Sequence, residues 1–165
     1  MEAAITASQL ASQLGEKLCK AGVMLVTAES CTGGWVAREI TAIAGSSQWF
    51  ERGFVTYTNI SKQEMLGVSE QTLLNHGAVS EQVVSEMARG AINNSHARLV
   101  VAITGIAGPG GGSVEKPVGT VWFAWANSNG EIRTDCQHIA GDREQVRQEA
   151  VIIALQGLIV FLNHH

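Results

Sequence analysis

The sequence predicts an α/β fold: a single-domain, three-layer α/β/α sandwich with a mixed sheet of about five strands, spanning residues 1–165. Three observations favour this fold. A length of 165 residues is typical of one domain. Amphipathic helices alternate with short apolar runs, as in sheets that carry helices on both faces. The run Leu99–Ile103 is continuously apolar, which is typical of a strand covered on both faces.

The first part of the chain alternates helices and strands. Leucines spaced by four predict a helix over about residues 8–20, which Gly22 ends because glycine favours a left-handed C-terminal residue. The apolar run over residues 24–28 predicts a strand. A second helix is expected to follow Ser30 and to stop at Gly45.

A strand, a short helix and a longer helix are expected next. Residues 53–57 predict the strand. Asn59 or Ser61 is expected to cap the short helix, since Ser61 and Glu64 have capping-box spacing. Ser80 opens a well-patterned helix whose apolar residues share one face.

The C-terminal part predicts a hairpin and a final helix. Residues 118–126 and 131–139 are joined by a turn sequence and are expected to pair antiparallel. Asp142 and Gln145 form a plausible capping box for a helix that reaches about Leu162. Because that helix has two apolar stripes, one more than a surface helix needs, we expect the second stripe to meet another subunit or another helix.

Composition excludes several classes of protein. The formal net charge of -4 argues against a broad nucleic-acid interface. Three scattered cysteines without C-x-x-C spacing indicate neither a disulfide framework nor a zinc site, and they suit a cytoplasmic protein. No metal or other cofactor is predicted. The most apolar stretch, residues 151–162, is too short to span a membrane, so we expect no membrane partner.

The turn that follows the first predicted strand, residues 27–34, is the first candidate site. Ser30 lies where a strand meets a helix, so the backbone N–H groups of the residues after it are suited to an oxyanion or a phosphate. The alternative is that Ser30 only caps the helix. Cys31 is a rival nucleophile, because a thiol at a helix start can have a lowered pKa.

Two further segments carry polar groups at strand ends. Lys62 follows a predicted strand, where it is either a solvated side chain or a base with a lowered pKa that takes a serine proton, with Tyr57 to relay or orient it. The glycine-rich segment 104–119 is either flexible surface or a close backbone approach to a ligand. Arg143 is suited to a phosphate or to an acidic neighbour.

Together these segments resemble the C-terminal domain of the competence/damage-inducible protein CinA. The segments that carry the resemblance are TAESCTGG (27–34), GSS (45–47), GFVTYTN (53–59), Lys62, GAVS (77–80), TGIAGP (104–109), KPVGT (116–120) and GDR (141–143). The resemblance runs from about residue 8 to 162 in consistent order. It implies a homodimer that hydrolyses the carboxamide of nicotinamide mononucleotide (NMN) to nicotinic acid mononucleotide and ammonia, in pyridine nucleotide salvage.

The resemblance also implies roles for individual residues. Ser30 matches the nucleophile of the family, Lys62 its lysine and Tyr57 its tyrosine. The backbone of Cys31, Thr32 and Gly33, or of Thr104 and Gly105, is expected to hold the oxyanion. Ser47 and Arg143 are expected to hold the substrate phosphate.

Three alternatives remain open at the level of sequence. The chain is either this amidohydrolase, a nucleotide-binding relative without turnover, or an amidase for another carboxamide. A fourth possibility, an interaction protein that uses the apolar C-terminal helix, has no motif of its own.

Overall fold

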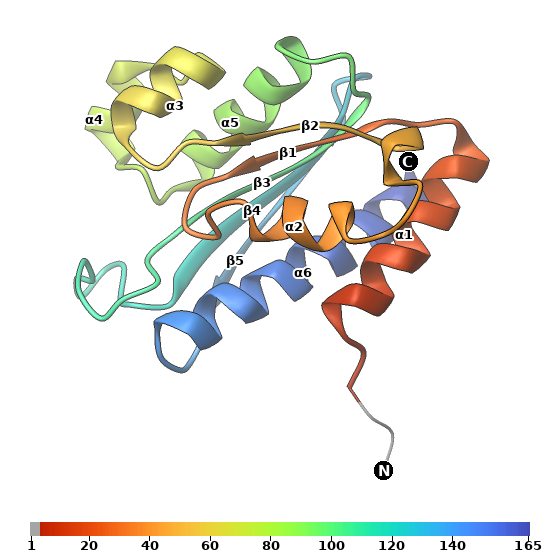
Figure 1. The fold of residues 1–165 in the computed structure, drawn as a ribbon. Helices are drawn as coiled ribbons and strands as arrows, with labels where there is room; N and C mark the ends of the chain where they lie inside the picture. The colour runs from red at the N-terminus through yellow and green to blue at the C-terminus, as the bar shows by residue number, and fades with distance from the viewer. Residues whose placement is uncertain (1–3) are drawn as a thin grey trace.

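A five-stranded mixed sheet forms the centre of the fold (Figure 1). The structure is a computed structural model that describes residues 4–165. The strands are β1 (Leu25–Glu29), β2 (Phe50–Val55), β3 (Leu99–Gly105), β4 (Thr120–Asn127) and β5 (Ile132–His138). Their order is β2-β1-β3-β4-β5, with β1 parallel to both β2 and β3, and β4 antiparallel to both β3 and β5. The predicted mixed sheet and its hairpin are therefore confirmed.

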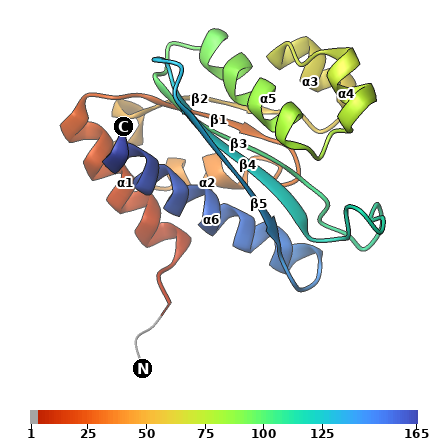
Figure 2. The same cartoon turned by 180° about the vertical axis from the view of Figure 1, so that it is seen from behind.

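Helices cover both faces of the sheet, which gives the three layers (Figures 1 and 2). One face carries α1 (Ala7–Ala21), α2 (Trp35–Thr41) and α6 (Arg143–His164), and the other carries α3 (Asn59–Leu66), α4 (Glu70–His76) and α5 (Glu81–Asn93). Two apolar cores follow from this arrangement. Leu25, Val101 and Phe123 point into the first core, while Val26, Val100 and Ala124 point into the second, as alternation along a strand requires.

The predicted start of α2 is wrong, and the reason lies in two glycines. Gly33 and Gly34 have φ of 58° and 95°, a left-handed backbone that cannot continue a helix from Ser30. The helix begins at Trp35 with Gly34 as its N-cap, and it ends at Thr41 rather than at Gly45. Four residues of turn therefore separate Ser30 from α2, so Ser30 is not a helix cap.

Two other local predictions are corrected in the segment that follows β2. Thr58, rather than Asn59 or Ser61, caps α3, and Ser61 is the partner of Thr58 in the capping box. The short helix α4 was not predicted, because Leu73 is its only buried residue and no apolar periodicity marks it. The predicted caps Ser80 and Asp142 are confirmed at the starts of α5 and α6.

The second apolar stripe of α6 is largely buried within the same chain. Val151, Leu155 and Leu158 are fully buried in the first core, and α1 packs along α6. Among the described residues, α6 is the one helix long and apolar enough to cross a membrane by length and composition. Its buried residues nevertheless lie between α1 and the sheet, as in the core helix of a folded domain.

Gly90 allows α5 to lie directly against the end of α3. A Cβ atom at Gly90 would overlap the backbone carbonyl oxygen of Leu66, which has no side-chain freedom to move aside. We expect Gly90→Ala to lower the free energy of unfolding by about 1–3 kcal/mol through overpacking. Chemical denaturation measures this, with Gly110→Ala as the control because a Cβ atom there meets nothing within 4 Å. Equal stability of the two variants would contradict this account of the helix contact.

Candidate active site

Ser30 lies in the turn at the carboxyl end of β1, the edge where open α/β sheets bind ligands. Its N–H donates to the carbonyl oxygen of Ile103 on β3, at 3.0 Å, and its own carbonyl oxygen accepts from the N–H of Gly33, also at 3.0 Å. Ser30 is 8% exposed. The backbone therefore fixes Ser30 at the end of the sheet, and its hydroxyl is available for contacts beyond the strand.

Lys62 lies on α3, on the face of the sheet opposite α2, and its side chain reaches Ser30 at the end of β1. Its Nζ lies 3.0 Å from Ser30 Oγ and 3.0 Å from the carbonyl oxygen of Thr56. The N–H of Thr56 donates to the carbonyl oxygen of Glu29, which ties the end of β2 to β1 and places α3 beside the turn. The fold therefore brings together two residues that are 32 positions apart in the chain.

The surroundings of Lys62 favour its neutral form. Lys62 is 2% exposed, and burial lowers the pKa of its amine below the ordinary value of 10.5. An ammonium has three N–H groups, and the described residues offer it two acceptors, Ser30 Oγ and the Thr56 carbonyl oxygen. A neutral amine instead donates to Thr56 and offers its lone pair to the Ser30 hydroxyl. The predicted alternative of a solvated lysine is wrong.

Tyr57 does not lie between Ser30 and Lys62. It is 56% exposed, and its hydroxyl accepts a hydrogen bond of 2.6 Å from Arg143 Nη2. Because Lys62 contacts Ser30 directly, no relay through Tyr57 is needed, and that prediction is corrected. Arg143 Nη1 also donates to the carbonyl oxygen of Gly108, at 2.7 Å, so Arg143 bridges Tyr57 and the glycine-rich segment.

A cavity of about 240 Å³ opens over Ser30. It is lined by Ser30, Cys31, Tyr57, Gly105, Ile106, Ala107, Gly108, Gly110, Gly111 and Arg143. It therefore joins the turn after β1, the end of β2, the glycine-rich segment and the start of α6. Ligand cavities typically measure about 300–1,000 Å³, so this one suits a ring with its carboxamide, while a larger molecule would extend out of it.

Glu29 supports the turn from inside the protein, a role that sequence reasoning missed. Its carboxyl accepts from Thr32 Oγ1 at 2.7 Å and from the N–H groups of Val36 and Ala37 at 2.9 and 3.1 Å. Burial raises the pKa of Glu29, and these hydrogen bonds oppose that shift. Glu29 thus satisfies the start of α2, which has no side-chain N-cap.

Arg147 on α6 supports the same turn from outside and was also missed. Its Nε donates to the carbonyl oxygen of Cys31 at 2.9 Å, and its Nη2 donates to that of Thr32 at 3.3 Å. Its guanidinium lies 5.5 Å from the centre of the Trp35 ring. The spacing of Arg143 and Arg147 by four, which puts both on one face of α6, was the available signal.

Cys31 is not poised as a nucleophile. Burial raises the pKa of its thiol to about 12, so the thiolate is a minor form at neutral pH. The side chain is 5% exposed, although the residue lines the cavity over Ser30. The rival prediction of a cysteine nucleophile is therefore wrong.

The remaining predicted site residues divide between the cavity and other places. Gly105 lines the cavity, but Thr104 does not, and its hydroxyl donates to the carbonyl oxygen of Ala78. Thr32 points its hydroxyl at Glu29. The N–H of Gly33 is already used by Ser30, which corrects its prediction as an oxyanion donor.

Ser47 is displaced from the site altogether. It lies in the 3-10 turn Ser46–Gln48, which precedes β2. Because Phe50 pairs with Leu25, this turn is beside the start of β1, whereas Ser30 follows its end. A strand of this length spans roughly 16 Å at about 3.3 Å per residue. The predicted contact of Ser47 with the substrate phosphate is therefore wrong within one chain.

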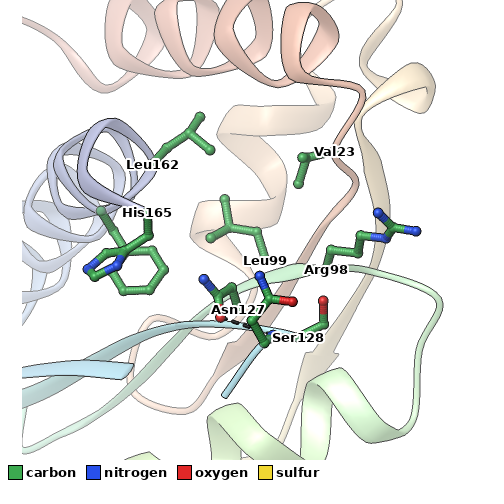
Figure 3. A pocket seen from close by; sticks show the side chains of 9 residues that line it. Val23, Arg98, Leu99, Asn127, Ser128, Leu162 and His165 are labelled. Atoms are coloured by element: carbon green, nitrogen blue, oxygen red, sulfur yellow. Dashed lines mark hydrogen bonds between the residues drawn. The ribbon is translucent and has the colours of Figure 1, made fainter. Parts of the chain in front are cut away.

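A larger hollow of about 460 Å³ lies at that opposite edge of the sheet (Figure 3). Val23, Leu99 and Leu162 form apolar walls, and Arg98 and Asn127 lie at its rim. It contains no counterpart of the buried serine and lysine. Residues 4–165 also hold no group of three or more histidine, cysteine or acidic side chains arranged for a metal ion.

Known proteins share both the sequence and the fold of this chain. The model of the CinA C-terminal domain matches residues 7–162. The chain is 59% identical, over 150 residues, to the nicotinamide-nucleotide amidohydrolase PncC of Escherichia coli K12, covering 91% of each protein. The PncC of Pseudomonas putida is 51% identical over 150 residues, covering 91% of this chain and 93% of that protein.

Solved structures give the same result. The competence/damage inducible protein CihA from Agrobacterium tumefaciens matches with a TM-score of 0.93 and 46% identity, covering 99% of each chain. The competence damage-inducible protein A from Klebsiella pneumoniae matches with a TM-score of 0.94 and 39% identity, covering 97% of this chain and 99% of that one. The resemblance read from the sequence and the α/β fold are both confirmed.

The role of Glu29 is testable by a nearly isosteric change. Oε1 of Glu29 accepts from Thr32 and Val36, and Oε2 accepts from the N–H of Ala37. In Glu29→Gln an amide NH2 group replaces one of these oxygens. If it replaces Oε2, it faces the N–H of Ala37, and two donors then point at each other. We expect the free energy of unfolding to fall by about 1–3 kcal/mol, the cost of an unsatisfied buried donor. Urea titration compares it with Glu64→Gln, which changes an exposed side chain. If neither variant had a lower free energy of unfolding than the wild type, Glu29 would not hold the turn as a carboxylate.

Proposed function

This chain belongs to the CinA C-terminal domain family and is an amidohydrolase, and from that premise we propose that it hydrolyses NMN to nicotinic acid mononucleotide and ammonia. The names of the relatives in Escherichia coli and Pseudomonas putida support the substrate. One observation carries the chemistry: a buried lysine amine lies 3.0 Å from the hydroxyl of a serine that lines a cavity. We infer a serine nucleophile activated by a lysine base.

Acylation begins with proton transfer from Ser30 to Lys62. As the neutral Lys62 amine accepts the hydroxyl proton, Ser30 Oγ forms a bond to the carboxamide carbon and the carbonyl electron pair moves to its oxygen. Collapse of this intermediate breaks the carbon–nitrogen bond. The leaving nitrogen takes the proton from Lys62 and departs as ammonia, so Lys62 serves first as base and then as acid.

Hydrolysis of the acyl-enzyme repeats these steps with water. Lys62, neutral again, accepts a proton from water while the water oxygen attacks the ester carbon. Collapse breaks the bond to Ser30 Oγ, which recovers its proton from Lys62, and the nicotinic acid product leaves. Since the base is the neutral amine, turnover rises with pH through the pKa of Lys62, which burial holds below the ordinary lysine value.

Arg143 is suited to the substrate phosphate. Two of its five N–H donors are used, by Gly108 and Tyr57, and Arg143 lines the cavity, which is too small for the entire nucleotide. With the nicotinamide ring beside Ser30, the ribose phosphate extends outward past Tyr57. A guanidinium binds phosphate through paired hydrogen bonds. Such a deamidation serves pyridine nucleotide salvage, because it returns a nicotinamide nucleotide to the acid form.

Ammonia release tests the proposal. We expect purified protein to release ammonia from NMN, and Ser30→Ala and Lys62→Met each to lower kcat by roughly 10³-fold or more, since the two residues act as a unit. Ser12→Ala and Lys17→Met change exposed residues of α1 and are the matched controls.

Other outcomes separate the alternatives. Binding of NMN without ammonia would indicate a nucleotide-binding relative that has lost turnover. Faster turnover of nicotinamide or nicotinamide riboside than of NMN would indicate an amidase for another carboxamide. Near wild-type turnover by Ser30→Ala would end the account of the nucleophile.

A further inference from the structure

The geometry points to Arg147 as a positioning residue, whose guanidinium holds the peptide between Cys31 and Thr32 so that the N–H groups following Ser30 face the oxyanion. The inference rests on the proposed function, because it takes Ser30 as the nucleophile. It gives a role in catalysis to Arg147, which lies on α6 and is 116 positions from Cys31 in the sequence.

Arg147 makes a two-pronged contact with the turn. Nε and Nη2 donate to two successive carbonyl oxygens, those of Cys31 at 2.9 Å and of Thr32 at 3.3 Å. The Trp35 ring, 5.5 Å from the guanidinium carbon, limits its movement on the other side. The planar guanidinium fixes the directions of its two donors toward the two carbonyls, which the flexible ammonium of a lysine does not, so lysine is not an equivalent residue.

Because the peptide bond is planar, a contact to a carbonyl oxygen also sets the direction of the N–H group of the next residue. In a planar trans peptide the C=O and N–H bonds point in opposite directions. Because Arg147 draws the Cys31 carbonyl toward α6, the N–H of Thr32 points away from α6. The hydrogen bond from Gly33 to the Ser30 carbonyl orients the N–H of Cys31 in the same manner.

These two N–H groups are the free donors of the turn. Within residues 4–165, neither Cys31 nor Thr32 donates its N–H to a protein acceptor, although both residues are buried. Buried N–H groups without a partner are rare, so a ligand oxygen is their natural acceptor. Attack by Ser30 Oγ places negative charge on the carbonyl oxygen next to these donors, and the charge of Arg147 strengthens them through the shared peptide.

The test compares Arg147→Met with Arg133→Met. Arg133 also lies 5.5 Å from a tryptophan ring, that of Trp125, but on β5 and away from Ser30, so this control removes an equivalent stacked guanidinium. We expect kcat for NMN to fall roughly 10- to 100-fold in Arg147→Met alone, since small misplacements of catalytic groups cost up to about 10²-fold. KM should stay within about twofold of the control, and the midpoint of the pH profile within ~0.3 unit of it.

A second measurement separates positioning from loss of structure. 3-Pyridineboronic acid carries the nicotinamide ring with boron in place of the carboxamide carbon, and addition of Ser30 Oγ to boron puts an oxygen in the oxyanion position. Calorimetry should show that its affinity for Arg147→Met falls by the same factor as kcat, while affinity for nicotinic acid mononucleotide is unchanged. The boronate affinity of Arg147→Lys, which keeps the positive charge but loses the planar pair of N–H donors, should lie between those of the wild type and Arg147→Met.

Each outcome decides the inference. It is overturned if folded Arg147→Met turns over NMN at the rate of Arg133→Met, or if boronate and product affinity fall together. If Arg147→Met does not fold, Arg147→Lys is compared with the wild type by the same two criteria. If the wild type releases no ammonia, the proposed function fails, and the boronate comparison still decides the role of Arg147 because it needs only Ser30 and the cavity.

Discussion

The burial of the Lys62 amine against Ser30 is the constraint on which the rest of the site depends. A lysine removed from water loses the solvation of its charged form, so the neutral amine is favoured where a base is needed. The same burial is possible only because α3 packs beside the end of β1, with Thr56 bonded to Glu29. The lowered pKa of Lys62 therefore depends on the packing of α3 beside β1, and a change that disturbs this packing should also change the pKa.

The turn that carries Ser30 is held from two sides by opposite charges. Glu29 takes hydrogen bonds from Thr32 and from the start of α2, while Arg147 donates to the carbonyl oxygens of Cys31 and Thr32. Each residue lies on a regular element of the fold, β1 or α6, and sites supported by such elements keep their geometry better than sites on free loops. The central parallel strands thus supply the position of Ser30, and α6 supplies both Arg143 and Arg147.

Sequence patterns predicted what depends on local chemistry. The apolar run of β3, the β4–β5 hairpin and the caps Ser80 and Asp142 were recovered, because periodicity and capping are encoded over a few residues. The start of α2 was misplaced because two left-handed glycines end the turn only after four residues. Ser30 and Lys62 were predicted as nucleophile and base from their places at strand ends, and the family resemblance implied the same roles.

The contact between Ser30 and Lys62 and the role of Arg147 arise from packing between distant segments that no local pattern reports. Ser47 shows the converse. It belongs to a segment that matches the family, yet the length of β1 places it at the other end of the sheet from Ser30.

The most direct measurement of the central claim is an NMR titration of the Lys62 Nζ in protein labelled with ¹⁵N-lysine. The account predicts a pKa for Lys62 below the ordinary lysine value of 10.5, because burial disfavours the ammonium. A pKa of Lys62 at or above 10.5 would contradict it, because an amine that stays protonated at neutral pH cannot take the proton of Ser30.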